Sequence, residues 1–186
     1  MKFAVASIVF SGLCVITSAS PVARAAAEPA TVPDCGYPTV PLLRAYSSSA
    51  TAHFYTTNAT EMDAFINGAD HYISEGVAAQ ILPSDTQAPT AVPLFRMYNA
   101  KSTDYFYTAN TTQRDDLLSL GNYVSQGVTG YVYPDQECGT VPLYRVDQRT
   151  DHVDFNFYTT DQAEVDDYVD VLGYNNSGVT AYVNPQ

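Results

Sequence analysis

Apolar and polar residues alternate in three short segments that share the pattern V-P-L-x-R. The segments begin at Val40, Val92 and Val141. In the first of them, a period of two places Leu42, Arg44 and Tyr46 on one face of a strand. The intervening Leu43 and Ala45 then share the other face. The proline at the second position fits the start of a strand or an edge strand, so each segment is predicted to be a β-strand.

A second apolar segment follows each of these strands after a polar turn. The turns cover residues 47–51, 99–103 and 148–154, and the aromatic pairs after them are Phe54-Tyr55, Phe106-Tyr107 and Phe157-Tyr158. Two β-prone segments joined by a short polar turn are typical of a hairpin. We therefore expect each V-P-L-x-R strand to pair with the aromatic strand that follows it.

A helix start comes next, at the same place each time. Good N-cap residues, Asn58, Asn110 and Asp161, are followed three positions later by Glu61, Gln113 and Glu164. This spacing resembles a capping box with Asn or Asp in place of Ser or Thr. A short helix is predicted in each case, ending at a glycine: Gly68, Gly121 or Gly173.

A further strand is predicted after Gly76, Gly127 and Gly178. One face of this strand carries small apolar residues and is predicted to lie in the core: Val77, Ala79, Ile81, then Val128, Gly130, Val132, then Val179, Ala181, Val183. The other face carries Gln80, Tyr131 and Tyr182. A proline follows each of these strands, at Pro83, Pro134 or Pro185.

These elements recur as three copies of one β-β-α-β unit, spaced by 52 residues (92 − 40) and 49 residues (141 − 92). One unit cannot bury its own apolar face, whereas three can close on one another. We predict an α+β, mainly β, fold in which three β-β-α-β repeats close around a pseudo-threefold axis. A β-trefoil-like arrangement is the alternative. The single domain spans 40–186, with copy one at 40–83, copy two at 92–134 and copy three at 141–185.

The repeat resembles a family of secreted bacterial and fungal proteins with motifs close to P-L-Y-R-L-Y-N, D-H-F-Y-T-T-N and E-G-V-x-x-Y-V-Y-P. The match is carried by residues 93–99, 53–58, 75–77 and 127–134, and the resemblance covers nearly all of 40–185. That family has no assigned function and is often appended to cell-wall hydrolases, which implies a wall- or glycan-binding module. Copy three departs from the pattern, because Asp147 replaces a tyrosine and Asn156 a histidine.

The N-terminal residues have the features of a secretory signal peptide. Met1-Lys2 is followed by an apolar stretch of roughly 14 residues, which is too short to span a bilayer as a stable helix. Small residues around Ala25 suit a cleavage site. We expect a signal peptide at 1–25, a lead-in at 26–39, and a secreted protein without a membrane anchor.

The charge of the chain argues against two classes of partner. The formal net charge is −12, and removal of Lys2 and Arg24 leaves six basic residues (8 − 2) against twenty acidic ones, or −14. Such a surface repels phosphate backbones and anionic lipids, so we expect no nucleic-acid partner and no membrane partner.

The cysteines and sequons fit an extracellular protein. Cys14 lies in the expected signal peptide, so Cys35 and Cys138 remain as an even pair and are predicted to form a disulfide. Two distant cysteines supply too few ligands for a zinc site, and no metal is expected. Three sequons mark candidate glycosylation sites at Asn58, Asn110 and Asn175.

Catalytic patterns are not evident in the sequence. The three histidines, His53, His71 and His152, occupy different places in the repeat. The chain has no G-x-S-x-G elbow, P-loop, H-E-x-x-H or EF-hand loop, and no pair of carboxylates stands out for glycoside hydrolysis. We therefore expect a non-enzyme without a cofactor.

The repeated polar and aromatic residues are the candidate ligand-binding site. An aromatic ring beside an arginine suits a sugar, because the ring stacks on C–H groups while the guanidinium reaches hydroxyls. The candidates are Arg44, Tyr46, His53, Tyr55, Arg96, Tyr98, Tyr107 and Arg145. A structural interpretation remains open, in which the arginines pair with the helix aspartates Asp63, Asp115 and Asp166 and the tyrosines Tyr55, Tyr107 and Tyr158 are core rings.

Two functions from different classes follow. The first is a secreted, lectin-like or cell-wall carbohydrate-binding protein whose partner is a glycan or wall polymer. The second is a secreted effector, inhibitor or antigen that contacts a host or surface protein through the turns that differ between copies. Because folding demands the same residues in every copy, the differing positions are the better place to look for function.

Overall fold

The structure is a computed structural model that describes residues 35–83, 88–149 and 154–186. The described residues all belong to one unit, Val32–Gln186. The expected signal peptide at 1–25, most of the lead-in and His152 lie outside the described residues. No helix in the described part is long and apolar enough to cross a membrane.

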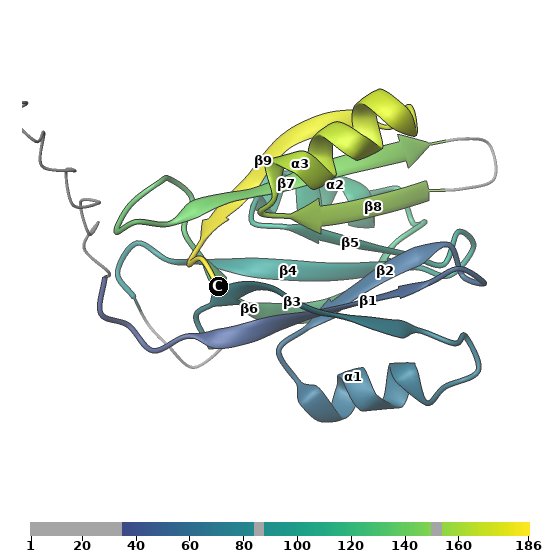
Figure 1. Cartoon of the computed structure of the whole chain (residues 1–186), viewed down its shortest axis with the longest axis horizontal. Helices are drawn as coiled ribbons and strands as arrows, with labels where there is room; N and C mark the ends of the chain where they lie inside the picture. The colour runs from purple at the N-terminus through teal and green to yellow at the C-terminus, as the bar shows by residue number, and fades with distance from the viewer. Residues whose placement is uncertain (1–34, 84–87, 150–153) are drawn as a thin grey trace, which may run out of the picture. The chain divides into compact units, whose positions relative to one another are not determined.

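Each copy folds into the predicted order of strand, strand, helix and strand (Figure 1). Copy one comprises β1 (Val40–Ser47), β2 (Ala52–Thr56), α1 (Ala59–Ile66) and β3 (Ile73–Ile81). Copy two comprises β4 (Val92–Asn99), β5 (Asp104–Thr108), α2 (Thr111–Ser119) and β6 (Val124–Val132). Copy three comprises β7 (Val141–Arg149), β8 (Asp154–Thr159), α3 (Gln162–Asp166), the π-helical turn η1 (Asp167–Val171) and β9 (Asn175–Val183).

The strands form three similar sheets of three antiparallel strands, in the orders β2-β1-β3, β5-β4-β6 and β8-β7-β9. The fold is therefore mainly β and consistent with a threefold repeat. The first strand of each copy is the central one, so its proline marks the start of a strand and not an edge strand. Pro41, for example, pairs with Gln80 of β3.

The predicted alternation of faces along the first strands is wrong in detail. Leu42 and Ala45 are both buried although they are three residues apart, and so are Leu94 and Met97 in β4. The register of β1 against β3 shifts between Leu42 and Leu43 and again between Arg44 and Ala45. A bulge adds a residue to one strand and interrupts the period of two, which a search for strict alternation does not anticipate.

The same irregularity affects the predicted core of the last strands. Ala79, Ile81, Val132, Ala181 and Val183 are buried as expected. However, Val128 is 40% exposed and Val179 is 45% exposed. Each pairs with a residue next to a register shift, Phe95 or Tyr144, where the alternation of faces is lost.

The three predicted N-caps are confirmed. Asn58 accepts hydrogen bonds from the backbone of Thr60 and Glu61, Asn110 from Gln113, and Asp161 from Ala163. The capping box itself is not closed in the predicted way, because the Asn58 N–H donates to Thr56 Oγ1 at 3.0 Å and leaves the Glu61 carboxylate for other donors. Gly121 (φ 76°) and Gly173 (φ 74°) adopt the left-handed conformation that ends a helix.

Short β-bridges join the ends of the three sheets. Gln80 bonds with Asn184, Leu82 with Tyr131, and Tyr133 with Tyr182, with N···O distances of 2.8–3.1 Å. Each copy therefore bonds to both others through the same stretch of its last strand. The predicted disulfide between Cys35 and Cys138 is present, with Cα atoms 5.1 Å apart, and joins the lead-in to the segment before copy three.

Candidate binding site

Three equivalent tyrosines occupy the interior where the sheets meet. The side chains of Tyr55, Tyr107 and Tyr158 are 1%, 2% and 1% exposed. Their hydroxyls donate in a cycle, from Tyr55 to the Tyr158 carbonyl, from Tyr158 to the Tyr107 carbonyl and from Tyr107 to the Tyr55 carbonyl, at 2.7–2.9 Å. Each hydroxyl also accepts from a backbone N–H of the same three residues.

This cycle satisfies every hydroxyl without a ligand. Burial raises the pKa of all three phenols well above the ordinary value, so they remain neutral donors. Their rings contact one another edge to face at 5.3–5.6 Å. Tyr55 and Tyr107, both candidates for ligand binding, thus take the structural role that the sequence had left open, and a sugar outside the protein cannot stack on their rings.

The repeated arginines link neighbouring copies through glutamates. Arg44 donates two hydrogen bonds of 2.9 Å to Glu164 on α3, and Arg96 donates bonds of 3.0 and 2.7 Å to Glu61 on α1. The partner is therefore the residue at the third helical position and not the aspartate at Asp63 or Asp166. We name these contacts the Arg44 junction, between copies one and three, and the Arg96 junction, between copies two and one.

Aromatic rings and hydroxyls complete these two junctions. The guanidinium carbon of Arg44 lies 5.1 Å from the ring centre of Phe157, and that of Arg96 lies 5.1 Å from that of Phe54. Burial raises the pKa of both glutamates, but hydrogen bonds from the arginine and from a threonine outweigh it, so the pKa of Glu61 and of Glu164 lies below the ordinary value. Both carboxylates are therefore ionised at neutral pH.

His53 extends the Arg44 junction. Its Nε2 lies 3.2 Å from Glu75 Oε2, and the Arg44 Nε lies 3.0 Å from the same oxygen. Burial lowers the pKa of His53, and the nearby Glu75 carboxylate offsets only part of this effect. The half-buried ring of Tyr46 packs 4.6 Å from the imidazole, just as Tyr98 packs 4.6 Å from Tyr105 in copy two.

The third junction differs from the other two. Arg145 of copy three lies over Phe106 of copy two, with 4.8 Å from its guanidinium carbon to the ring centre, as expected from the repeat. The helix residue at the corresponding position is Gln113, which is neutral. Among residues 35–83, 88–149 and 154–186, no carboxylate lies within 4 Å of the Arg145 guanidinium. We name this contact the Arg145 junction.

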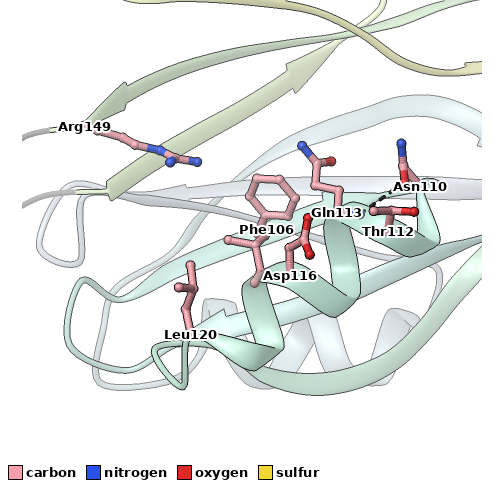
Figure 2. Close-up of a pocket in the computed structure, with 8 residues that line it drawn as sticks. Phe106, Asn110, Thr112, Gln113, Asp116, Leu120 and Arg149 are labelled. Atoms are coloured by element: carbon pink, nitrogen blue, oxygen red, sulfur yellow. Dashed lines mark hydrogen bonds between the residues drawn. The ribbon is translucent and has the colours of Figure 1, made fainter.

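A groove of about 400 Å³ opens beside the Arg145 junction, between α2 and the end of β7 (Figure 2). Its apolar lining consists of the buried Phe106 and of Leu117 and Leu120. Its polar lining consists of Asn110, Thr112, Gln113, Asp116 and Arg149. Figure 2 shows Arg149 reaching from β7 toward the side of Phe106, with Gln113, Asn110 and Thr112 along the helix opposite. We name this feature the α2 groove.

The α2 groove contains none of the predicted ligand-binding residues, although Arg145 lies over the ring of Phe106, which lines the groove. The one sequence feature that could have located it is Gln113, which stands where copies one and three have glutamate. The remaining lining residues occupy ordinary helix and turn positions, and their contact with Arg149 depends on how copies two and three pack together.

Two other hollows offer less chemistry. One of about 190 Å³ lies beside α1 and is lined by Ala64, Phe65, Gly68, Asp70 and Tyr72. The other, of about 420 Å³, lies beside η1 and is lined by Asp167, Tyr168, Val171 and Leu172. Neither offers the range of amide, hydroxyl, carboxylate and guanidinium groups that the α2 groove presents. Within the described residues, no group of three or more His, Cys, Asp or Glu is arranged to hold a metal.

The sequons fall on exposed positions. Asn58 and Asn110 are helix N-caps whose side-chain oxygens accept backbone hydrogen bonds, and Asn175 begins β9. A glycan attached to the amide nitrogen of Asn58 or Asn110 would leave the side-chain oxygen able to keep its capping hydrogen bond. Asn110 also lines the α2 groove, so glycosylation there would place a sugar at its edge.

Comparison with known proteins identifies the family but no activity. No curated protein and no solved structure matches the chain. The family model for a domain of unknown function, DUF5648, matches residues 41–184, which include the nine described strands except for Val40, the first residue of β1. The chain therefore belongs to the DUF5648 family.

Proposed function

We propose that the protein is a secreted, non-catalytic carbohydrate-binding protein, lectin-like or associated with a cell-wall polymer. The observation that carries this proposal is the α2 groove, which places apolar side chains beside five polar ones within about 400 Å³. Small-ligand sites combine an apolar lining with a few converging polar groups in this way. A sugar offers both C–H faces and hydroxyls that donate and accept, so it fits a groove of this mixed character.

The groove is supported by rigid elements. Asn110 is held as the N-cap of α2, its oxygen accepting from the Gln113 backbone at 3.1 Å. Gln113 is held in turn, because its side-chain oxygen accepts from Thr108 Oγ1 at 2.7 Å. Side chains fixed by such contacts lose little conformational entropy when a ligand binds. Secretion, the Cys35–Cys138 disulfide and the exposed sequons belong to the same proposal of an extracellular protein.

The proposal includes the arrangement of the three copies, which we take to close around a pseudo-threefold axis. The cyclic hydrogen bonds of the three buried tyrosines and the three bridges between strand ends support closure. In a closed arrangement the three junctions are equivalent in position, and they differ only in the residues placed there. Binding is then a property of one junction and not of every copy.

A second candidate function is contact with a host or surface protein. Large apolar side chains are exposed near the ends of helices and the starts of the third strands: Ile73 (72%), Leu120 (69%), Val124 (59%), Val171 (74%) and Leu172 (55%). Exposed apolar residues that gather in one region mark protein interfaces, whereas single ones are ordinary. This alternative predicts a protein ligand that depends on these residues and not on the polar groups of the α2 groove.

A glycan array probed with the chain from residue 26 onward tests the proposal. We expect binding to a restricted set of glycans and loss of that binding in Arg149→Ala, whose side chain lines the groove. Lys101→Ala is the matched control, because it removes one exposed positive charge from a turn outside the groove. An array without any bound glycan contradicts the proposal, and so does equal loss of binding in both variants.

A further inference from the structure

The Arg145 junction is the one place where the repeated arginine meets a neutral helix residue. At the other two junctions a glutamate accepts both guanidinium nitrogens, within 2.7–3.0 Å. Gln113 cannot replace that carboxylate. Its side chain is neutral, and one of its two terminal atoms is an amide nitrogen, which donates as the arginine does. Arg145 also interacts with the Tyr158 hydroxyl through a hydrogen bond that lowers the pKa of this tyrosine, but the described residues place no carboxylate beside it, so the junction has more donors than acceptors.

A second arginine adds to this excess of donors. Arg149 follows Arg145 by four residues on β7, and the pairing of β7 with β8 is regular over this stretch, so both lie on the same side of that strand. Arg145 lies over the Phe106 ring, and the same ring and Arg149 line the α2 groove. Within the described residues, Asp147 is the carboxylate that pairs with Arg149, and its oxygen lies 3.7 Å from Arg149 Nε, which is too long for a hydrogen bond.

We propose that the α2 groove binds a saccharide that carries a carboxylate, of the uronic acid class, with its carboxylate beside Gln113, whose side chain stands where glutamate stands at the other junctions. Arg149, which lines the groove, holds the carboxylate, since a guanidinium matches its two oxygens in geometry and charge. Arg145, over the Phe106 ring, adds positive charge next to it. Gln113 donates a further hydrogen bond, and Asp116, Asn110 and Thr112 are in reach of the ring hydroxyls. This inference rests on the proposed function and specifies its ligand class.

The charge of the whole chain limits the form of that ligand. A net charge near −14 on the secreted protein repels a long polyanion. A single uronic acid residue, at the end of a glycan or next to neutral sugars, brings one carboxylate to two arginines without that penalty. The groove, at about 400 Å³, also has room for one or two sugar rings within it.

Titration calorimetry with a uronic acid-terminated oligosaccharide and its carboxyl-reduced, neutral analogue tests the inference. The decisive variant is Gln113→Glu, which supplies the missing carboxylate from within the protein and should weaken binding of the acidic sugar by about tenfold to a hundredfold. The matched control is Gln126→Glu, which makes the same change at an exposed position of β6 outside the groove and should bind as the wild type does. Arg149→Ala, at a position 56% exposed, removes one of the two arginines without touching the core and should weaken binding similarly.

The outcomes separate this inference from the proposed function. Equal binding of the acidic and neutral oligosaccharides overturns the inference and leaves carbohydrate binding intact. Unchanged affinity in Gln113→Glu overturns it as well, and so does equal binding of a hexaglutamate peptide. Failure to bind either of the two oligosaccharides, together with an empty glycan array, contradicts both proposals.

Discussion

The Arg44 and Arg145 junctions have different residues at the same positions of the repeat, and the arginine is paired differently in each. At the Arg44 junction, the arginine pairs with Glu164 and Glu75, and both carboxylates are ionised partners within the protein. At the Arg145 junction, the arginine keeps its aromatic neighbour but meets Gln113. At the Arg44 junction, carboxylates of the protein neutralise the arginine. At the Arg145 junction, the positive charge of the arginine remains beside the α2 groove.

A second pair of positions separates the same two junctions. At the Arg44 junction, His53 packs against the Phe155 ring with centres 5.3 Å apart. The corresponding residues at the Arg145 junction are Asn156 and Asp104, and Asn156 donates to the Asp104 carboxylate from its backbone at 3.1 Å and its side chain at 2.7 Å. The departure of copy three from the repeat pattern at Asn156 is thus explained by its buried partner. Divergence at one position requires a matching change in the neighbouring copy.

The largest expected effect concerns what the junctions share. Changing Tyr158 to Phe removes a hydroxyl that donates to the Tyr107 carbonyl and accepts from the Tyr107 N–H, and both are buried. Leaving two buried polar groups without partners should lower the free energy of unfolding by about 2–4 kcal/mol. Tyr55→Phe should cost the same within error, as measured by urea denaturation. Tyr182→Phe, at a half-buried ring, serves as the control, and a large difference between the two buried positions would break the equivalence of the junctions.

The next effect concerns the ion pairs. Glu61→Gln turns the Arg96 junction into the arrangement found at Arg145 and should cost about 1–2 kcal/mol of unfolding free energy, because the Arg96 and Glu61 side chains are only 13% and 31% exposed. Glu164→Gln should cost less, since Arg44 keeps Glu75 at 3.0 Å. Equal stability of Glu61→Gln and the wild type would show that a glutamine serves the scaffold as well as a glutamate, and the contrast between the junctions would lose its meaning.

The sequence predicted the scaffold better than the site. The period, the three N-caps and the order of elements were all readable, because every copy must solve the same folding problem with similar residues. The buried tyrosines and repeated arginines were ambiguous, since a ring or a guanidinium suits a core as well as a sugar. The bulges at Leu42 and Ala45 were missed, because they depend on strand pairing and not on a pattern within one strand. The α2 groove was missed because Arg149 and Gln113 come from different copies.

The two junctions should also respond to pH with opposite signs. Burial raises the pKa of Asp104 from 3.8 to about 6, so the folded state takes up a proton as the pH falls from 8 to 5 while the unfolded state does not. This proton uptake should raise the free energy of unfolding by about 1 kcal/mol over that range, and the gain is lost as the pH rises through 6. Burial lowers the pKa of His53, so its contribution to stability is present above the ordinary pKa of 6.5 and is lost as the pH falls.

Urea denaturation between pH 5 and pH 8 separates the two contributions. The difference between the wild type and Asp104→Asn should show the gain in the free energy of unfolding as the pH falls. The difference between the wild type and His53→Asn should show the loss in the free energy of unfolding over the same range. The window excludes lower pH, where Glu61 and Glu164 begin to be protonated and weaken their ion pairs. The same pH dependence in Asp104→Asn and in the wild type would mean that this carboxyl is already ionised in the folded protein.

The smallest effect is the most specific one. Gln113→Glu places a carboxylate where Arg145 lacks one, and we expect it to raise the free energy of unfolding by about 0.5–1 kcal/mol, as measured by urea denaturation. The same variant is expected to lose affinity for the acidic saccharide, whereas Gln126→Glu should change neither property. Stability and binding thus oppose one another at position 113. If the variant were less stable than the wild type, Arg145 would already have a partner at this junction, and no carboxylate from outside would be needed there.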